Sequence, residues 1–127
     1  MNLQNPPQAA PQVLVVEDEE LLRELLIDMI GELGTTVIAV GTADAGIEVL
    51  KQTPIIDLLI TDVRMPSRLN GWDLAQAAFA LRPDLPIIIM SGFSEHTAPL
   101  PPKAVFVRKP WQLNALCELV RARLGKV

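Results

Sequence analysis

Short apolar runs alternate along this chain with segments of helical periodicity, and this alternation limits the possible folds more than any other feature. The first run, residues 13–16, is continuously apolar and rich in β-branched side chains. Such a run is typical of a strand that is buried on both faces of a parallel sheet. Helical patterns separate it from similar runs further along, and parallel strands need crossover connections of this kind. The sequence therefore predicts an α/β fold with a parallel sheet.

The predicted elements follow one another in a regular order, with one exception. Strands are expected at residues 13–16, 36–40, within 55–61, 86–90 and 104–107, and helices at 19–33, 42–52, 70–81 and 111–124. The exception is the connection between the fourth and fifth strands, residues 91–103, which contains Pro99, Pro101 and Pro102. Because proline interrupts helices, a full crossover helix does not fit there, and a shortened or irregular fourth helix is expected.

Length and composition indicate one small globular domain. A chain of 127 residues can bury a real core, and 50% hydrophobic with 20% charged residues excludes a disordered chain. Residues 1–11 hold three of the eleven prolines and are expected to form a flexible tail before a domain at 12–127. The single cysteine and single histidine exclude an internal disulfide and a multi-histidine zinc site.

Several classes of function are disfavoured by features that the sequence lacks. No apolar run approaches the length of about 18 residues that a membrane span requires, and residues 1–11 do not resemble a signal peptide. A cytoplasmic protein without membrane contact is therefore expected. With three Phe, two Trp and no Tyr, the chain has few aromatic side chains on which single-stranded nucleic acid could stack. The net charge of −4 also does not favour direct binding of nucleic acid.

Polar residues follow the predicted strands at the points where the strands end. Glu17 and Asp18 follow the first strand, Asp62 the third, Ser91 the fourth and Lys109 the fifth. The carboxyl ends of parallel strands meet at one edge of the sheet, so these side chains should converge. Mg²⁺ would offset the repulsion among the three carboxylates, and a lysine suits a phosphoryl oxygen. The pattern predicts a phosphate-neutralising pocket in which the Asp62 carboxylate is the best candidate nucleophile.

Four stretches give this pattern a specific resemblance. They are VLVVEDEE at 13–20, LITDVRMP at 59–66, IMSG at 89–92 and FVRKP at 106–110. In this order, each at a strand end, they resemble the receiver domain of response regulators, the phosphoacceptor module of two-component signalling. The resemblance covers about residues 12–125. It implies a flavodoxin-like, doubly wound sheet of five parallel strands in the order 2-1-3-4-5.

The resemblance also implies a role for each residue of the predicted pocket. Asp62 would accept the phosphoryl group from a phosphohistidine, in a reaction that depends on Mg²⁺. Asp18 and Asp62 would bind the metal directly, together with the backbone carbonyl of Arg64. Glu17 would hold a metal-bound water, although the family more often has Asp at that position.

Three further residues take roles from the same resemblance. Ser91 would hydrogen-bond the phosphoryl group after moving toward it, and Lys109 would pair with another phosphoryl oxygen. Phe106 stands at the position of the family's switch aromatic. The expected partners are a histidine kinase or histidine phosphotransfer protein as donor and a downstream protein of unknown identity. The chain would promote its own phosphorylation and its own dephosphorylation, the latter slowly, without being an enzyme in the usual sense.

Some other functions fit these residues less well, and others stay open. A haloacid-dehalogenase-like phosphohydrolase needs a second acid two residues after the nucleophile, where this chain has Arg64. A flavin carrier of the same fold would need a phosphate-binding loop after the first strand, but the acidic residues 17–20 would repel phosphate. A phosphorylation-independent interaction module stays open, as does a receiver fragment of a hybrid histidine kinase. Unless the chain is a fragment of a longer protein, a protein contact is the expected output, since the last predicted helix ends close to residue 127.

Overall fold

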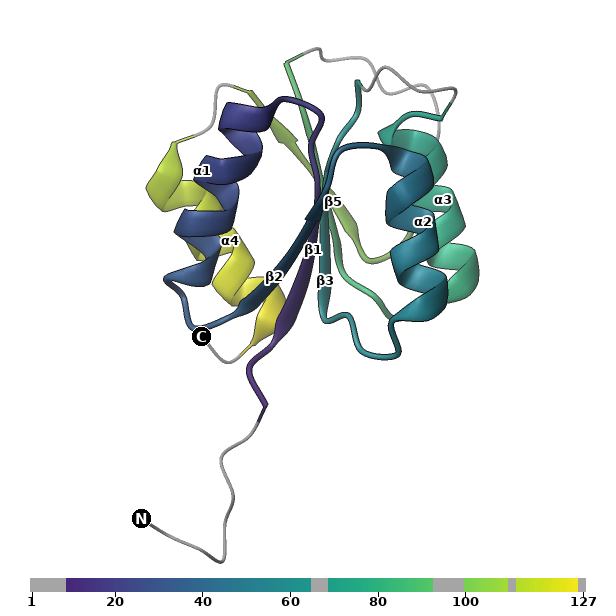
Figure 1. Cartoon of the computed structure of the whole chain (residues 1–127), viewed down its shortest axis with the longest axis horizontal. Helices are drawn as coiled ribbons and strands as arrows, with labels where there is room; N and C mark the ends of the chain where they lie inside the picture. The colour runs from purple at the N-terminus through teal and green to yellow at the C-terminus, as the bar shows by residue number, and fades with distance from the viewer. Residues whose placement is uncertain (1–8, 65–68, 93–99, 110–111, 126–127) are drawn as a thin grey trace, which may run out of the picture.

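Five parallel strands form one sheet with helices on both faces (Figure 1). The structure, a computed structural model, describes residues 9–64, 69–92, 100–109 and 112–125. The elements are β1 (Gln12–Val16), α1 (Glu20–Gly31), β2 (Thr36–Val40), α2 (Ala43–Gln52), β3 (Leu58–Asp62), α3 (Gly71–Leu81), β4 (Ile87–Ser91), β5 (Ala104–Arg108) and α4 (Leu113–Leu124). The strand order β2-β1-β3-β4-β5 confirms the predicted fold class and the order that the resemblance implied.

The sheet separates two hydrophobic cores, as alternate side chains of each strand point to opposite faces. In β1, Leu14 and Val16 belong to the core beneath α2 and α3, while Val13 and Val15 belong to the core beneath α1 and α4. All four of these side chains are completely buried, which explains the uninterrupted apolar run. Burying one such side chain contributes roughly 1.5–3 kcal/mol. Figure 1 shows α1 and α4 together on one face and α2 and α3 together on the other.

Side-chain caps fix the beginnings of two helices. The Thr42 hydroxyl accepts a hydrogen bond from the Ala45 N–H at 3.1 Å, as expected for the cap of α2. At the start of α3, the Asn70 side chain accepts from the Asp73 N–H, and the Asp73 carboxylate accepts from the Asn70 N–H, both at 3.0 Å. This reciprocal pair is a capping box, and it holds the first turn of α3 in place.

The third, fourth and fifth strands each extend one residue further than the sequence predicts. The ladder continues through Asp62, which pairs with Met90, and through Ser91, which pairs with Arg108. The strand β3 begins at Leu58, inside the predicted range, while Ile55 is 63% exposed and lies outside the strand. Asp57, just before β3, accepts a hydrogen bond through its carboxylate from the Gln12 N–H at 2.7 Å, which ties this segment to the start of β1.

Two predictions fall outside the residues that the structure describes. The short helical segment expected around 94–98, between the fourth and fifth strands, and most of the expected tail, residues 1–8, are not among the described residues. Among the described residues, no helix has the length and apolar character needed to cross a membrane.

Candidate functional site

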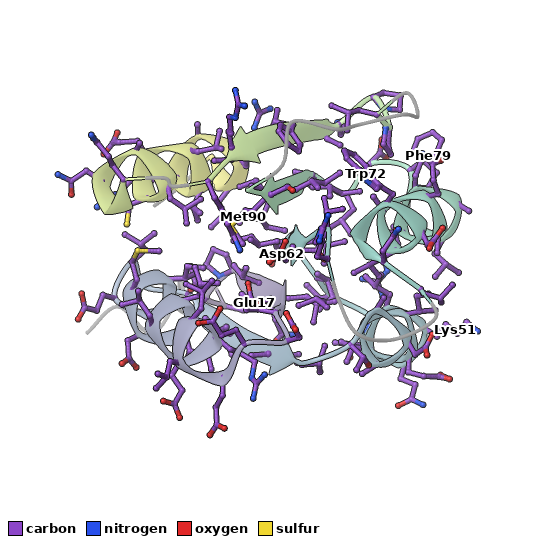
Figure 2. The ribbon with its side chains drawn as sticks, turned by 90° about the horizontal axis from the view of Figure 1, so that it is seen from above. Glu17, Lys51, Asp62, Trp72, Phe79 and Met90 are labelled. Carbon is purple, nitrogen blue, oxygen red and sulfur yellow. The ribbon has the colours of Figure 1, made fainter. Side chains whose placement is uncertain are left out.

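Three carboxylates meet at the carboxyl edge of the sheet. Asp62 ends β3, the middle strand of the sheet, and Glu17 and Asp18 directly follow β1, its neighbour. Figure 2 looks onto this edge and shows Glu17 and Asp62 near its centre, between the two helical layers. One carboxylate oxygen from each of the three residues lies within 4.8 Å of the other two. Glu17 is 1% and Asp62 8% exposed, whereas Asp18 faces solvent.

Lys109 supplies a positive charge to this carboxylate cluster. Its Nζ lies 2.7 Å from Asp62 Oδ2 and 3.8 Å from Glu17 Oε1. The backbone positions the lysine, because its N–H donates to the Ser91 carbonyl at 2.7 Å and so extends the pairing of β4 with β5. One ammonium group offsets only part of the charge of three carboxylates, so the cluster still attracts a cation.

Burial dominates the electrostatics of Glu17. It raises the pKa of the Glu17 carboxyl from 4.5 to about 7, and the nearby Asp62 acts in the same direction. The Glu19 N–H, which donates to Oε2 at 3.0 Å, and the ammonium of Lys109 both lower this pKa, but by less than burial raises it. Among the described residues, Oε1 of Glu17 is a buried oxygen with no hydrogen-bond partner. A buried acceptor in this state is costly unless something binds it.

The donor set of this edge fits Mg²⁺. Magnesium prefers oxygen ligands and keeps several of its waters, so one or two direct carboxylate ligands are enough. Glu17, Asp18 and Asp62 offer such oxygen atoms in a cluster that is open to solvent on the Asp18 side. The unpartnered Oε1 of Glu17 is a suitable acceptor for a water bound to the metal.

The turn between β1 and α1 is held by an arginine that the sequence did not single out. Arg23, on α1, donates from Nη1 to the Glu17 carbonyl at 2.9 Å. Gly41 leaves room for this contact, since a Cβ there would lie 3.3 Å from Nη1. Neither residue carries a local sequence signal, since Gly41 follows β2 and comes near Arg23 only when β2 lies beside β1.

The other predicted site residues occupy different positions around the cluster. Ser91 is 2% exposed at the end of β4, and Arg64 directs its N–H toward Asp62 Oδ1 at 3.3 Å. Phe106 instead lies on the α3 face of the sheet, where its ring stacks on Trp72. The ring centroids are 6.0 Å apart with an interplanar angle of 8°. No sequence pattern indicates this stacking, because it joins α3 to β5.

Comparison with known proteins gives a consistent result. A family model described as the response regulator receiver domain matches residues 13–121. The autoinducer 1 sensor kinase/phosphatase LuxN of Vibrio campbellii is 34% identical over 120 residues, which are 92% of this chain and 14% of LuxN. The chain therefore spans a small part of that relative.

Solved structures extend the same comparison. A response regulator receiver protein of Sinorhizobium medicae is 27% identical, with a TM-score of 0.82 and coverage of 91% of this chain and 95% of that one. The response regulator protein TrrA of Thermotoga maritima, solved in complex with Mg²⁺ and BeF, is 26% identical. Its TM-score is 0.79, with coverage of 90% of this chain and 99% of TrrA.

Proposed function

Because this chain belongs to the response regulator receiver domain family, we propose that Asp62 accepts a phosphoryl group from the phosphohistidine of a histidine kinase or phosphotransfer protein. The observation that carries this proposal is the ion pair of 2.7 Å between Lys109 Nζ and Asp62 Oδ2, inside the cluster formed with Glu17 and Asp18. A carboxylate that is placed next to a cation and a metal site is suited to attack phosphorus.

The reaction exchanges one bond to phosphorus for another. An oxygen of the Asp62 carboxylate attacks the phosphorus atom, and the bond from phosphorus to the histidine nitrogen breaks. The electron pair of that bond leaves with the imidazole, and Asp62 becomes an acyl phosphate. Water later hydrolyses this acyl phosphate, which returns the domain to its initial state. The domain is thus a phosphoacceptor that promotes its own modification.

The residues around Asp62 would stabilise the transferred phosphoryl group in different ways. Lys109 already touches one Asp62 oxygen and would follow the negative charge onto the new phosphoryl group. Ser91 would donate its hydroxyl to a second phosphoryl oxygen from the end of the adjacent strand β4. When bound, Mg²⁺ would offset the charge of the transferred group, held by Asp18, Asp62 and the carbonyl of Arg64. The arrangement relies on positioned charges, as phosphoryl transfer generally does.

A small phosphodonor tests the proposal without a partner protein. Incubation of the chain with acetyl phosphate and Mg²⁺ is expected to add the mass of one phosphoryl group, read by intact mass spectrometry. Chelation of Mg²⁺ with EDTA should reduce the adduct to background, because the charge of the carboxylates is then left unbalanced. No adduct in the presence of Mg²⁺ would contradict the proposal, as would an adduct that is indifferent to EDTA.

The first turn of α1 offers a contact for the donor protein. Leu21 is 76% exposed and lies in the first turn of α1, three residues after Asp18, at the same edge of the sheet. Replacing Leu21 with Asp should lower the rate of transfer from a phosphorylated histidine phosphotransfer protein by about tenfold, because a central apolar contact is lost. The rate with acetyl phosphate, measured in parallel, should stay within about twofold.

The chain offers a matched control for this variant. Leu81 is 45% exposed at the far end of α3, so Leu81→Asp introduces the same charge away from the acidic edge. It should leave both rates unchanged. If Leu21→Asp slows both donors equally, the helix acts on the chemistry itself and the docking role is wrong.

A further inference from the structure

The helix α3 begins in direct contact with the backbone of the proposed phosphoacceptor. At Gly71, its first residue, an added Cβ would lie 2.1 Å from the carbonyl oxygen of Asp62. The same Cβ would lie 2.8 Å from the carbonyl carbon of Asp62 and 2.8 Å from Cα of Val63. In addition, the Gly71 N–H donates to the Val63 carbonyl at 2.9 Å. Only a residue without a side chain fits against the end of this strand.

Neither side of this contact can move easily. Asp62 pairs with Met90 of β4, and the Val63 N–H donates to the Met90 carbonyl at 3.0 Å, so the sheet holds the strand end. The capping box between Asn70 and Asp73 holds the first turn of the helix. A Cβ at position 71 would overlap the backbone of Asp62 and Val63, and it must therefore displace either the end of β3 or the start of α3.

We propose that Gly71 is a positioning residue for phosphorylation, because it lets α3 support the backbone of Asp62 directly. The inference rests on the proposed function of Asp62. The Arg64 N–H donates to Asp62 Oδ1, and the carbonyl of Arg64 is a proposed metal ligand. A shift of the end of β3 therefore moves the nucleophile and a proposed ligand together, while Lys109, which directly follows β5, stays in place. Misplacement by about 1 Å costs up to about 100-fold in rate.

Two other glycines provide controls of graded severity. At Gly46 of α2, an added Cβ would lie 2.9 Å from a side-chain atom of Val16 and 3.4 Å from side-chain atoms of Leu74. Gly46→Ala thus crowds the core through side chains and does not touch the backbone at the end of β3. At Gly31 of α1, an added Cβ meets nothing within 4 Å, so Gly31→Ala should be harmless.

The experiment compares Gly71→Ala with these two variants under conditions where all remain folded. Calorimetric titration of the unphosphorylated proteins gives the Mg²⁺ affinity, and acetyl phosphate at saturating Mg²⁺ gives the rate of phosphorylation. Gly71→Ala should weaken Mg²⁺ binding by about tenfold and slow phosphorylation by about 10- to 100-fold. Gly46→Ala should lose stability but keep both quantities within about twofold, and Gly31→Ala should resemble the unaltered chain.

Several outcomes would overturn the inference. Unchanged Mg²⁺ affinity and rate in Gly71→Ala would do so, and so would equal losses in Gly46→Ala. If the unaltered chain takes no phosphoryl group, the proposed function of Asp62 is wrong, and the relative Mg²⁺ affinities still decide the role of Gly71. If Gly71→Ala does not fold, hydrogen exchange of the unaltered chain replaces it. A supporting contact requires the Gly71 N–H to exchange only through global unfolding, so exchange through local opening would refute the inference.

Discussion

Replacing Asp62 with asparagine is expected to abolish the phosphoryl adduct that acetyl phosphate and Mg²⁺ produce on the unaltered chain. Asparagine has nearly the same shape as aspartate, so the end of β3 should keep its place. The amide lacks the nucleophilic oxygen and the negative charge that Lys109 Nζ contacts at 2.7 Å. Intact mass spectrometry should therefore show a loss of at least about 1,000-fold in the rate of adduct formation, as expected when a nucleophile is removed.

Two further variants make this result specific to the site. Asp84→Asn makes the same chemical change at an exposed position on the opposite edge of the sheet and should leave the adduct intact. Asp18→Asn keeps the acceptor but removes a proposed metal ligand, so the adduct should still form and require more Mg²⁺. An adduct that persists in Asp62→Asn would place the phosphoryl group on another carboxylate and overturn the assignment.

Replacing Glu17 with glutamine is expected to stabilise the metal-free chain and to weaken Mg²⁺ binding. Glutamine can still accept the hydrogen bond from the Glu19 N–H, and its amide can donate to the carboxylates of Asp18 or Asp62. It removes a carboxyl group whose pKa burial raises from 4.5 to about 7. That shift corresponds to at most about 3 kcal/mol of unfavourable free energy in the ionised form. Urea unfolding in EDTA at pH 8 should show a gain of about 1–3 kcal/mol.

The same shift sets the pH dependence of stability without metal. Because the folded state holds the Glu17 proton more tightly than the unfolded state, the cost of ionisation is absent below about pH 4.5 and complete above about pH 7. The free energy of unfolding of the unaltered chain should therefore contain a contribution that falls across this range. The contribution should be missing in Glu17→Gln. Saturating Mg²⁺ should restore stability to the unaltered chain more than to the variant.

Glu19→Gln is the matched control for the Glu17 substitution. The Glu19 side chain is exposed and makes no cap hydrogen bond at the start of α1. Its replacement should change stability by less than about 0.5 kcal/mol and should leave Mg²⁺ binding unchanged. If Glu17→Gln is less stable than the unaltered chain in EDTA, the buried carboxylate does not destabilise the metal-free protein and the prediction is wrong.

The sequence predicted the sheet well because its strands are marked by their own composition. The apolar run from Val13 to Val16 is completely buried, as expected for a strand covered on both faces. Strand boundaries are harder to predict where a polar residue is buried or an apolar residue is exposed. Asp62 and Ser91 are polar and were placed just beyond their strands, yet both are paired within the sheet. Ile55 is apolar, yet it is exposed and lies outside β3.

The convergence of the site could be predicted for the same topological reason. Carboxyl ends of parallel strands meet at one edge, so Glu17, Asp62 and Lys109 had to lie near one another once the strands were identified. The capping box of α3 also has a sequence signal, an Asn followed three residues later by an Asp. Arg23 and the stacking of Trp72 on Phe106 have no comparable signal, because each contact joins different elements.

The sequence by itself therefore determined the class of fold, the edge at which the site forms and the residue types that give the site its chemistry. These properties depend on local composition and on the order of elements along the chain. Only the tertiary structure decided how the site is held. Burial leaves an oxygen of Glu17 without a hydrogen-bond partner, and the packing of α3 against β3 excludes any side chain at Gly71. Both effects are set by distances between segments far apart in the chain, which no local pattern specifies.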